Sequence, residues 1–161
     1  MSSEHFDVLI IGAGLSGIDA ACHLQKNCPT RTFVILEARD RIGGTWDLFR
    51  YPGVRSDSDM FTLGYSFRPW TGAKSIAGGA SILEYIRATA AEHGVDRKIR
   101  FDHRVVRASW SSSERRWTVE AERGAGRGTA TFTCGFVFAC SGYYSYAEGY
   151  TPELPGIGRF K

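Results

Sequence analysis

The sequence predicts an α/β fold built on a parallel sheet. Two β-branched runs, Asp7 to Ile11 and Thr32 to Glu37, are typical of parallel strands that are covered on both faces. Between them, apolar residues recur at near-helical spacing from Leu15 to Leu24, and Pro29 follows the expected helix. The resulting strand-helix-strand unit spans about 30 residues, the usual size of a right-handed crossover.

From residue 38 to residue 79 the sequence shows no sustained period of either strand or helix. A structureless stretch of this length inside a compact domain is usually functional. A second helix is expected from Ser81 to His93, where Ser81 and Glu84 have capping-box spacing and Gly94 ends the helix.

The last third of the chain predicts a half-exposed antiparallel meander followed by a return to the parallel sheet. Gly135 to Cys140 is apolar throughout and predicts a separate, fully buried parallel strand. The strands expected before it are Ile99 to Phe101, Arg104 to Trp110, Arg116 to Glu122 and Thr129 to Cys134.

Composition excludes several classes of partner. The chain has 161 residues, 43% of them hydrophobic, and a formal net charge of only +3 with no basic stripe, so nucleic acid is not an expected partner. A cluster of four tyrosines near the C-terminus lacks interleaved basic residues, and we expect it to pack under a loop. These are Tyr143, Tyr144, Tyr146 and Tyr150.

Neither a membrane segment nor a metal site is indicated. The longest apolar run, Val8 to Ile11, is far shorter than a membrane span and begins too close to Met1 for a secretory signal, so we expect a cytoplasmic protein. The four cysteines form no CxxC pair and have no histidine at zinc-ligand spacing, so we expect reduced thiols and no metal.

A glycine motif carries the chemistry. Gly12, Gly14 and Gly17 have G-x-G-x-x-G spacing between the first strand and the first helix, where backbone N–H groups meet a pyrophosphate. Glu37 ends the second strand 20 residues after Gly17, where a carboxylate accepts hydrogen bonds from an adenosine ribose and repels a 2′-phosphate. The site therefore predicts FAD or NAD rather than NADP.

A second glycine pair favours FAD. Gly43 and Gly44 follow the second strand closely, where the chain passes an extended dinucleotide. A nicotinamide dehydrogenase has no need of this pair, although a flexible loop is the simpler alternative.

The segment that starts at Gly43 reads GGTWDLFRYPGVRSDSD, and further on stand FRPW at Phe67 and CSGYY at Cys140. These motifs resemble the Baeyer-Villiger type of class B flavoprotein monooxygenases, and the resemblance covers nearly the whole chain. It implies a Rossmann-like FAD-binding domain, with a parallel sheet, a βαβ unit and an antiparallel β-meander, incomplete at the C-terminus.

The resemblance also implies residue roles. Asp57 matches the active-site aspartate of the family, although an Asx-turn residue in a polar loop is the alternative for this position. The other implied contacts are Gly12, Gly14, Ser16 and Gly17 on the pyrophosphate, Glu37 on the ribose, Gly44, Thr45, Trp46, Asp47 and Leu48 along the flavin, Arg55 and Ser56 towards nicotinamide, and backbone groups of Val105 at the adenine.

The implied reaction is NADPH-driven reduction of FAD, followed by use of O2 to insert oxygen into a ketone or to oxidise a sulfide. The chain ends where the family's next signature begins, so we expect residues 1–161 to be the N-terminal part of the FAD domain, without the NADPH-binding domain and with apolar surface exposed. A non-catalytic FAD-binding fragment and an NAD-linked oxidoreductase domain are the alternatives. Oligomeric state is not indicated.

Overall fold

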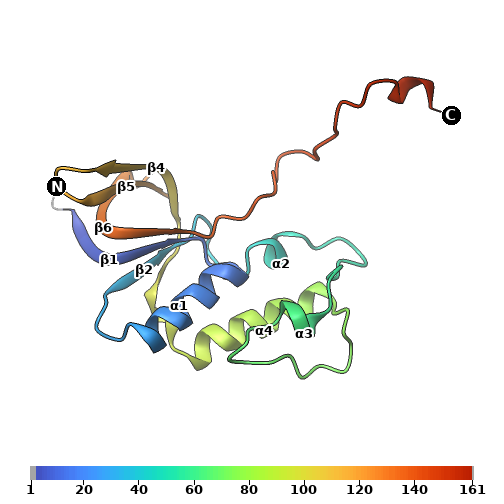
Figure 1. Cartoon of the computed structure of the whole chain (residues 1–161), viewed down its shortest axis with the longest axis horizontal. Helices are drawn as coiled ribbons and strands as arrows, with labels where there is room; N and C mark the ends of the chain where they lie inside the picture. The colour runs from blue at the N-terminus through green and yellow to red at the C-terminus, as the bar shows by residue number, and fades with distance from the viewer. Residues whose placement is uncertain (1–2, 161) are drawn as a thin grey trace.

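A mixed sheet of six strands organises residues 3–160, the part of the chain that the computed structural model describes (Figure 1). The strand order is β3-β2-β1-β6-β5-β4. β1 (Glu4–Ile11) pairs in parallel with β2 (Phe33–Leu36) and with β6 (Thr129–Ala139), and β3 (Ile99–Arg100) extends this parallel half. β4 (His103–Ser111) and β5 (Arg116–Arg123) form the antiparallel half with β6. The predicted fold class is confirmed.

Two longer helices lie side by side against one face of the sheet (Figure 1). They are α1 (Leu15–Asn27) and α4 (Gly79–Glu92), and they cover Val8 and Ile10 of β1. On the other face, Leu9 packs against the meander. The remaining helical segments are short: α2 (Thr45–Leu48), α3 (Met60–Leu63), η1 (Val95–Lys98) and η2 (Ile157–Arg159).

The long segment between β2 and α4 contains only two four-residue helices, as its lack of period predicted, yet it is firmly anchored. Tyr65 stacks between Phe67 and Tyr85, with ring centroids 5.2 Å apart in both pairs. Its hydroxyl donates to the carbonyl of Leu15, 3.1 Å away, which joins the segment to α1. The segment is therefore part of the core rather than a linker.

Two expectations about the last strand are wrong. One continuous strand, β6, replaces the two predicted strands, because its first half pairs with β5 while residues from Phe132 onwards pair with β1. The predicted full burial fails at Phe136 and Phe138, which are 56% and 42% exposed. No element among residues 3–160 covers this part of the sheet face fully, which agrees with the expected exposure of apolar surface.

The predicted start of the second helix is also wrong. α4 begins at Gly79 rather than after Ser81, and its N-cap, Gly78, makes no side-chain cap. Tertiary contacts decide this boundary, because the amide of Gly79 donates to Val54 and Gly78 bridges to Arg55.

The four tyrosines do not pack under a loop. They are between 50% and 90% exposed, because the chain leaves the sheet after β6 and extends away from it (Figure 1).

The closest backbone approach to any glycine of the fold is at Gly17. A Cβ at this position would lie 1.9 Å from the carbonyl oxygen of Gly12. We expect Gly17→Ala to lower the free energy of unfolding by about 1–3 kcal/mol, because helix and turn must separate. Urea denaturation measures this. Gly78→Ala is the control, since a Cβ there would have no atom within 4 Å; an equal loss in both variants would contradict the constraint.

Asp7 predicts a pH dependence. Bonds from the backbone and hydroxyl of Thr32, and then from Arg31, lower the pKa of Asp7 from 3.8 to about 2. The unfolded chain takes up this proton near 3.8, so the stabilisation is complete above that pH and is lost as the pH falls towards 2. Urea unfolding at pH 5 and pH 3 should show a smaller loss for Asp7→Asn than for the unsubstituted chain. Equal losses would disprove the linkage.

Candidate functional site

The first glycine turn joins β1 to α1 at the carboxyl edge of the parallel strands. Gly12 has a φ of +101°, and a Cβ there would lie 2.6 Å from the carbonyl oxygen of Cys140. Gly14 is the N-cap of α1, with no side-chain cap and no acidic residue in the first turn. The first amides of α1 therefore have no helical partner, and the exposed Ser16 lies among them. Such amides suit an anionic group.

Glu37 lies directly beside this turn. It is 6% exposed, and its carboxylate accepts hydrogen bonds from the amides of Ala13, at 2.7 Å, and Arg39, at 3.0 Å. Its own carbonyl accepts from His103 of β4 at 2.8 Å. The sequence correctly placed an acid next to the glycine turn, and its contact with a ribose stays a prediction.

The second glycine turn contacts the first through backbone atoms. The amide of Gly43 donates to the carbonyl of Ala13 at 3.0 Å. Gly44 has a φ of +53°, and a Cβ there would lie 3.1 Å from the Cα of Gly14. The glycine pair is thus part of a packed double turn rather than a flexible loop.

The α2 helix follows Gly44 and contains four of the predicted flavin contacts, of which three are half-buried and one is fully buried. Thr45, Trp46 and Leu48 are half-buried. Asp47 is 2% exposed, and its carboxylate faces three arginines from different segments instead of a surface. These are Arg39 at 3.2 Å, Arg50 at 3.0 Å and Arg87 of α4 at 2.9 Å.

Asp57 lies on the loop that precedes α3. Capping of α3 belongs to Asp59, whose carboxylate accepts from the amide of Thr62 at 2.9 Å. Asp57 is exposed, and within residues 3–160 its one hydrogen bond comes from the Ser58 hydroxyl at 3.5 Å. The pKa of Tyr144 is raised, mainly by its hydrogen bond from a neighbouring tyrosine and in part by the negative charge of Asp57.

The two residues before Asp57 differ in their exposure to solvent. Arg55 is exposed and pairs its backbone with Gly78. Ser56 is 1% exposed, and its hydroxyl accepts from the amide of Ala77 at 3.1 Å. Arg55 is accessible from solvent, whereas Ser56 holds the loop on the segment before α4.

Val105 lies in β4, two residues after the contact of His103 with Glu37. A β-bulge between Val105 and Arg107 interrupts the pairing with β5. The bulge locally disrupts the ladder beside the buried acid, which is where the adenine contact is expected.

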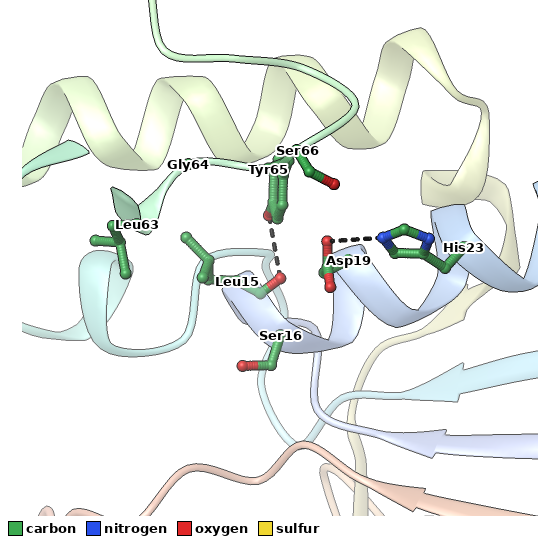
Figure 2. A pocket seen from close by; sticks show the side chains of 8 residues that line it. All are labelled: Leu15, Ser16, Asp19, His23, Leu63, Gly64, Tyr65 and Ser66. Atoms are coloured by element: carbon green, nitrogen blue, oxygen red, sulfur yellow. Dashed lines mark hydrogen bonds and ion pairs between the residues drawn. The ribbon is translucent and has the colours of Figure 1, made fainter. Parts of the chain in front are cut away.

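A cavity of about 250 Å³ lies on another side of α1, against residues 63–66 (Figure 2). The carboxylate of Asp19 and the imidazole of His23 lie 3.7 Å apart in it, and the Tyr65 hydroxyl donates to the carbonyl of Leu15 (Figure 2). Of the predicted site residues only Ser16 lines it. A second cavity, of about 410 Å³, lies between α1 and Phe138. Neither cavity coincides with the double glycine turn.

One residue of the site was missed. Arg39 connects Glu37 with Gly44 and Asp47. Its position two residues after the strand acid was the available signal, but arginines in such loops are usually solvated.

Residues 3–160 offer neither a membrane span nor a metal centre. They contain no helix long and apolar enough to cross a membrane. In the same residues no three His, Cys, Asp or Glu side chains gather in a way that could hold a metal ion.

The parallel half of the sheet, with α1 joining β1 to β2, has a Rossmann-like fold. Residues 10–72 match the family described as NAD(P)-binding Rossmann-like domain. The chain is 59% identical, over 159 residues, to the FAD-containing monooxygenase EthA of Mycobacterium tuberculosis, covering 98% of this chain and 32% of that protein. The resemblance to flavin monooxygenases is confirmed.

Solved structures agree. A steroid monooxygenase bound to NADP superimposes with a TM-score of 0.78 at 32% identity, covering 97% of this chain and 29% of that one. OTEMO in complex with FAD and NADP gives 0.75 at 30% identity, covering 99% and 29%. The chain thus spans about a third of the length of the proteins it matches.

Asp47 predicts a stability effect. We expect Asp47→Asn to lower the free energy of unfolding by about 1–3 kcal/mol, since three partly exposed arginines lose their shared carboxylate. Asp40→Asn is the control, because Asp40 pairs only with its exposed neighbour Arg41 among residues 3–160. Urea denaturation distinguishes the two; equal stability of both variants would show that the cluster contributes nothing.

Proposed function

We propose that this chain forms the FAD-binding part of an NADPH- and O2-dependent monooxygenase that inserts one oxygen into a ketone or oxidises a sulfur centre. The observation that carries the proposal is the double glycine turn, in which Gly43 and Gly44 meet the first turn beside the buried Glu37. A dehydrogenase that binds NAD through the first turn alone does not require the second. The similarity to FAD-containing monooxygenases supports the same assignment.

The residues present fit FAD. The uncapped amides at Gly14, Ser16 and Gly17 would bind the diphosphate, which Gly12 leaves open by its lack of a side chain. Glu37 would accept hydrogen bonds from the ribose, and the bulged strand at Val105 would face the adenine. Bound FAD would supply the redox chemistry, while these groups bind and orient it.

The flavin end would lie along Gly44 and α2. Thr45, Trp46 and Leu48 are half-buried and available there, whereas Asp47 would act from inside the protein by holding α2 in place. Asp57 and Arg55 are exposed on the following loop, where NADPH and substrate would approach, and Ser56 would fix that loop. Asp57 is the proposed active-site carboxylate.

Residues 1–161 would then be the N-terminal part of an FAD domain, with the NADPH-binding domain on other residues. A cytoplasmic location is part of the same proposal, because NADPH is available there. The alternative is a non-catalytic FAD-binding fragment, and NADPH consumption by residues 1–161 alone would exclude it.

Titration of the chain with FAD tests the proposal. We expect bound flavin with quenched fluorescence, weaker binding of FMN because it lacks the adenosine, and weaker binding of NAD. Glu37→Gln should raise the Kd for FAD about tenfold, because the glutamine side chain keeps only one of the two oxygens that accept hydrogen bonds in Glu37. Glu114→Gln, at an exposed turn, is the control. Preference for NAD would instead indicate an NAD-linked oxidoreductase, and absence of flavin binding would refute the proposal.

A further inference from the structure

Arg39 bonds to Glu37, to the second glycine turn and to α2, and reaches the first turn through Glu37. Its backbone amide donates to one oxygen of the Glu37 carboxylate at 3.0 Å. Its guanidinium donates to the carbonyl of Gly44 at 3.1 Å and lies 3.2 Å from the carboxylate of Asp47. The other oxygen of Glu37 accepts from Ala13 in the first turn. A single residue therefore connects the first turn, the strand acid and the second turn.

The side chain of Arg39 connects the second turn to α2 through one group. One terminal nitrogen of the guanidinium, Nη2, lies within reach of both the Gly44 carbonyl and the Asp47 carboxylate, and its two N–H groups serve the two oxygens together. Asp47 is itself held by Arg50 and Arg87, which fixes the far end of the connection on α4. The side chain of Arg39 is 30% exposed, so these bonds are partly shielded from water.

We propose that Arg39 is a positioning residue that sets the second glycine turn against the first and thereby selects an extended dinucleotide over its adenosine half alone. This inference rests on the proposed function. An ADP group would contact the first turn, Glu37 and the strand at Val105, whereas FAD would continue past Gly44. Arg39 acts on the Gly44 side through its side chain and on the Glu37 side only through its backbone, so substitution should affect the two ligands unequally.

The experiment measures the Kd of FAD and of ADP for the 161-residue chain and its variants. Arg39→Gln should raise the Kd for FAD about 10- to 100-fold, the effect of losing hydrogen bonds from a charged group, and change the Kd for ADP less than about threefold. Arg39→Lys should recover part of the loss, because an ammonium also donates several N–H groups from one nitrogen but is more strongly hydrated than a guanidinium. Thermal unfolding of each variant is followed in parallel.

Two variants serve as controls. Arg41→Gln removes a nearby guanidinium that, among residues 3–160, pairs only with Asp40, and both affinities should stay unchanged. Arg50→Gln removes one partner of Asp47 but no bond to Gly44, and it should lower stability more than it changes the ratio of the two Kd values.

The outcomes separate the two proposals. An equal rise of both Kd values in Arg39→Gln and Arg39→Lys, or no rise, would overturn the positioning role while leaving FAD binding intact. A chain that binds ADP but not FAD, without any substitution, would overturn the proposed function itself.

Discussion

The close approach of backbone to backbone at the carboxyl edge of the sheet is the constraint on which the rest of the structure depends. Gly17 allows α1 to contact the turn, Gly12 allows the end of β6 to contact it, and Gly44 allows the second turn to contact Gly14. Each contact needs a position without a side chain, and three separate segments of the chain meet there. The edge is consequently narrow and lined by main-chain groups, which suits a ligand bound through its phosphates.

This constraint explains why the glycine turns and the strand acid could be predicted from the sequence. Glycines that are needed for close approach stand at fixed spacing next to β-branched strands. The length of one strand-helix-strand crossover then predicts where the second strand ends, and Glu37 stands at that position. The fold class, α1 and the place of Glu37 depend on such local patterns and were predicted correctly. The start of α4 was not, because the capping signal at Ser81 competes with backbone contacts between Gly78–Gly79 and the loop at residues 54–55.

Burial was harder to predict than pairing. The run from Gly135 to Cys140 has the apolar composition of a strand that is buried on both faces, yet Phe136 and Phe138 are exposed. Composition shows that a strand is suited to burial, but it does not show whether other residues pack over it. The same limit applies to Asp47 and Asp57, which are both acids in one irregular loop. Only the packed structure shows that Asp47 is enclosed by arginines and that Asp57 is exposed.

The two ends of the site are therefore built by different physical means. At the end proposed to bind the adenosine, hydrogen-bonded strands and the N-terminus of α1 fix Glu37 and the first turn, so regular secondary structure determines the geometry. At the other end the chain is irregular, and its shape depends on ionic bonds from Arg39 and Arg87 to a buried carboxylate and on aromatic packing around Tyr65. Ionic bonds with partly exposed arginines weaken with salt, whereas backbone ladders do not. Salt should thus loosen the second turn before it affects the first, which makes the end proposed to lie along the flavin the more salt-sensitive half of the site.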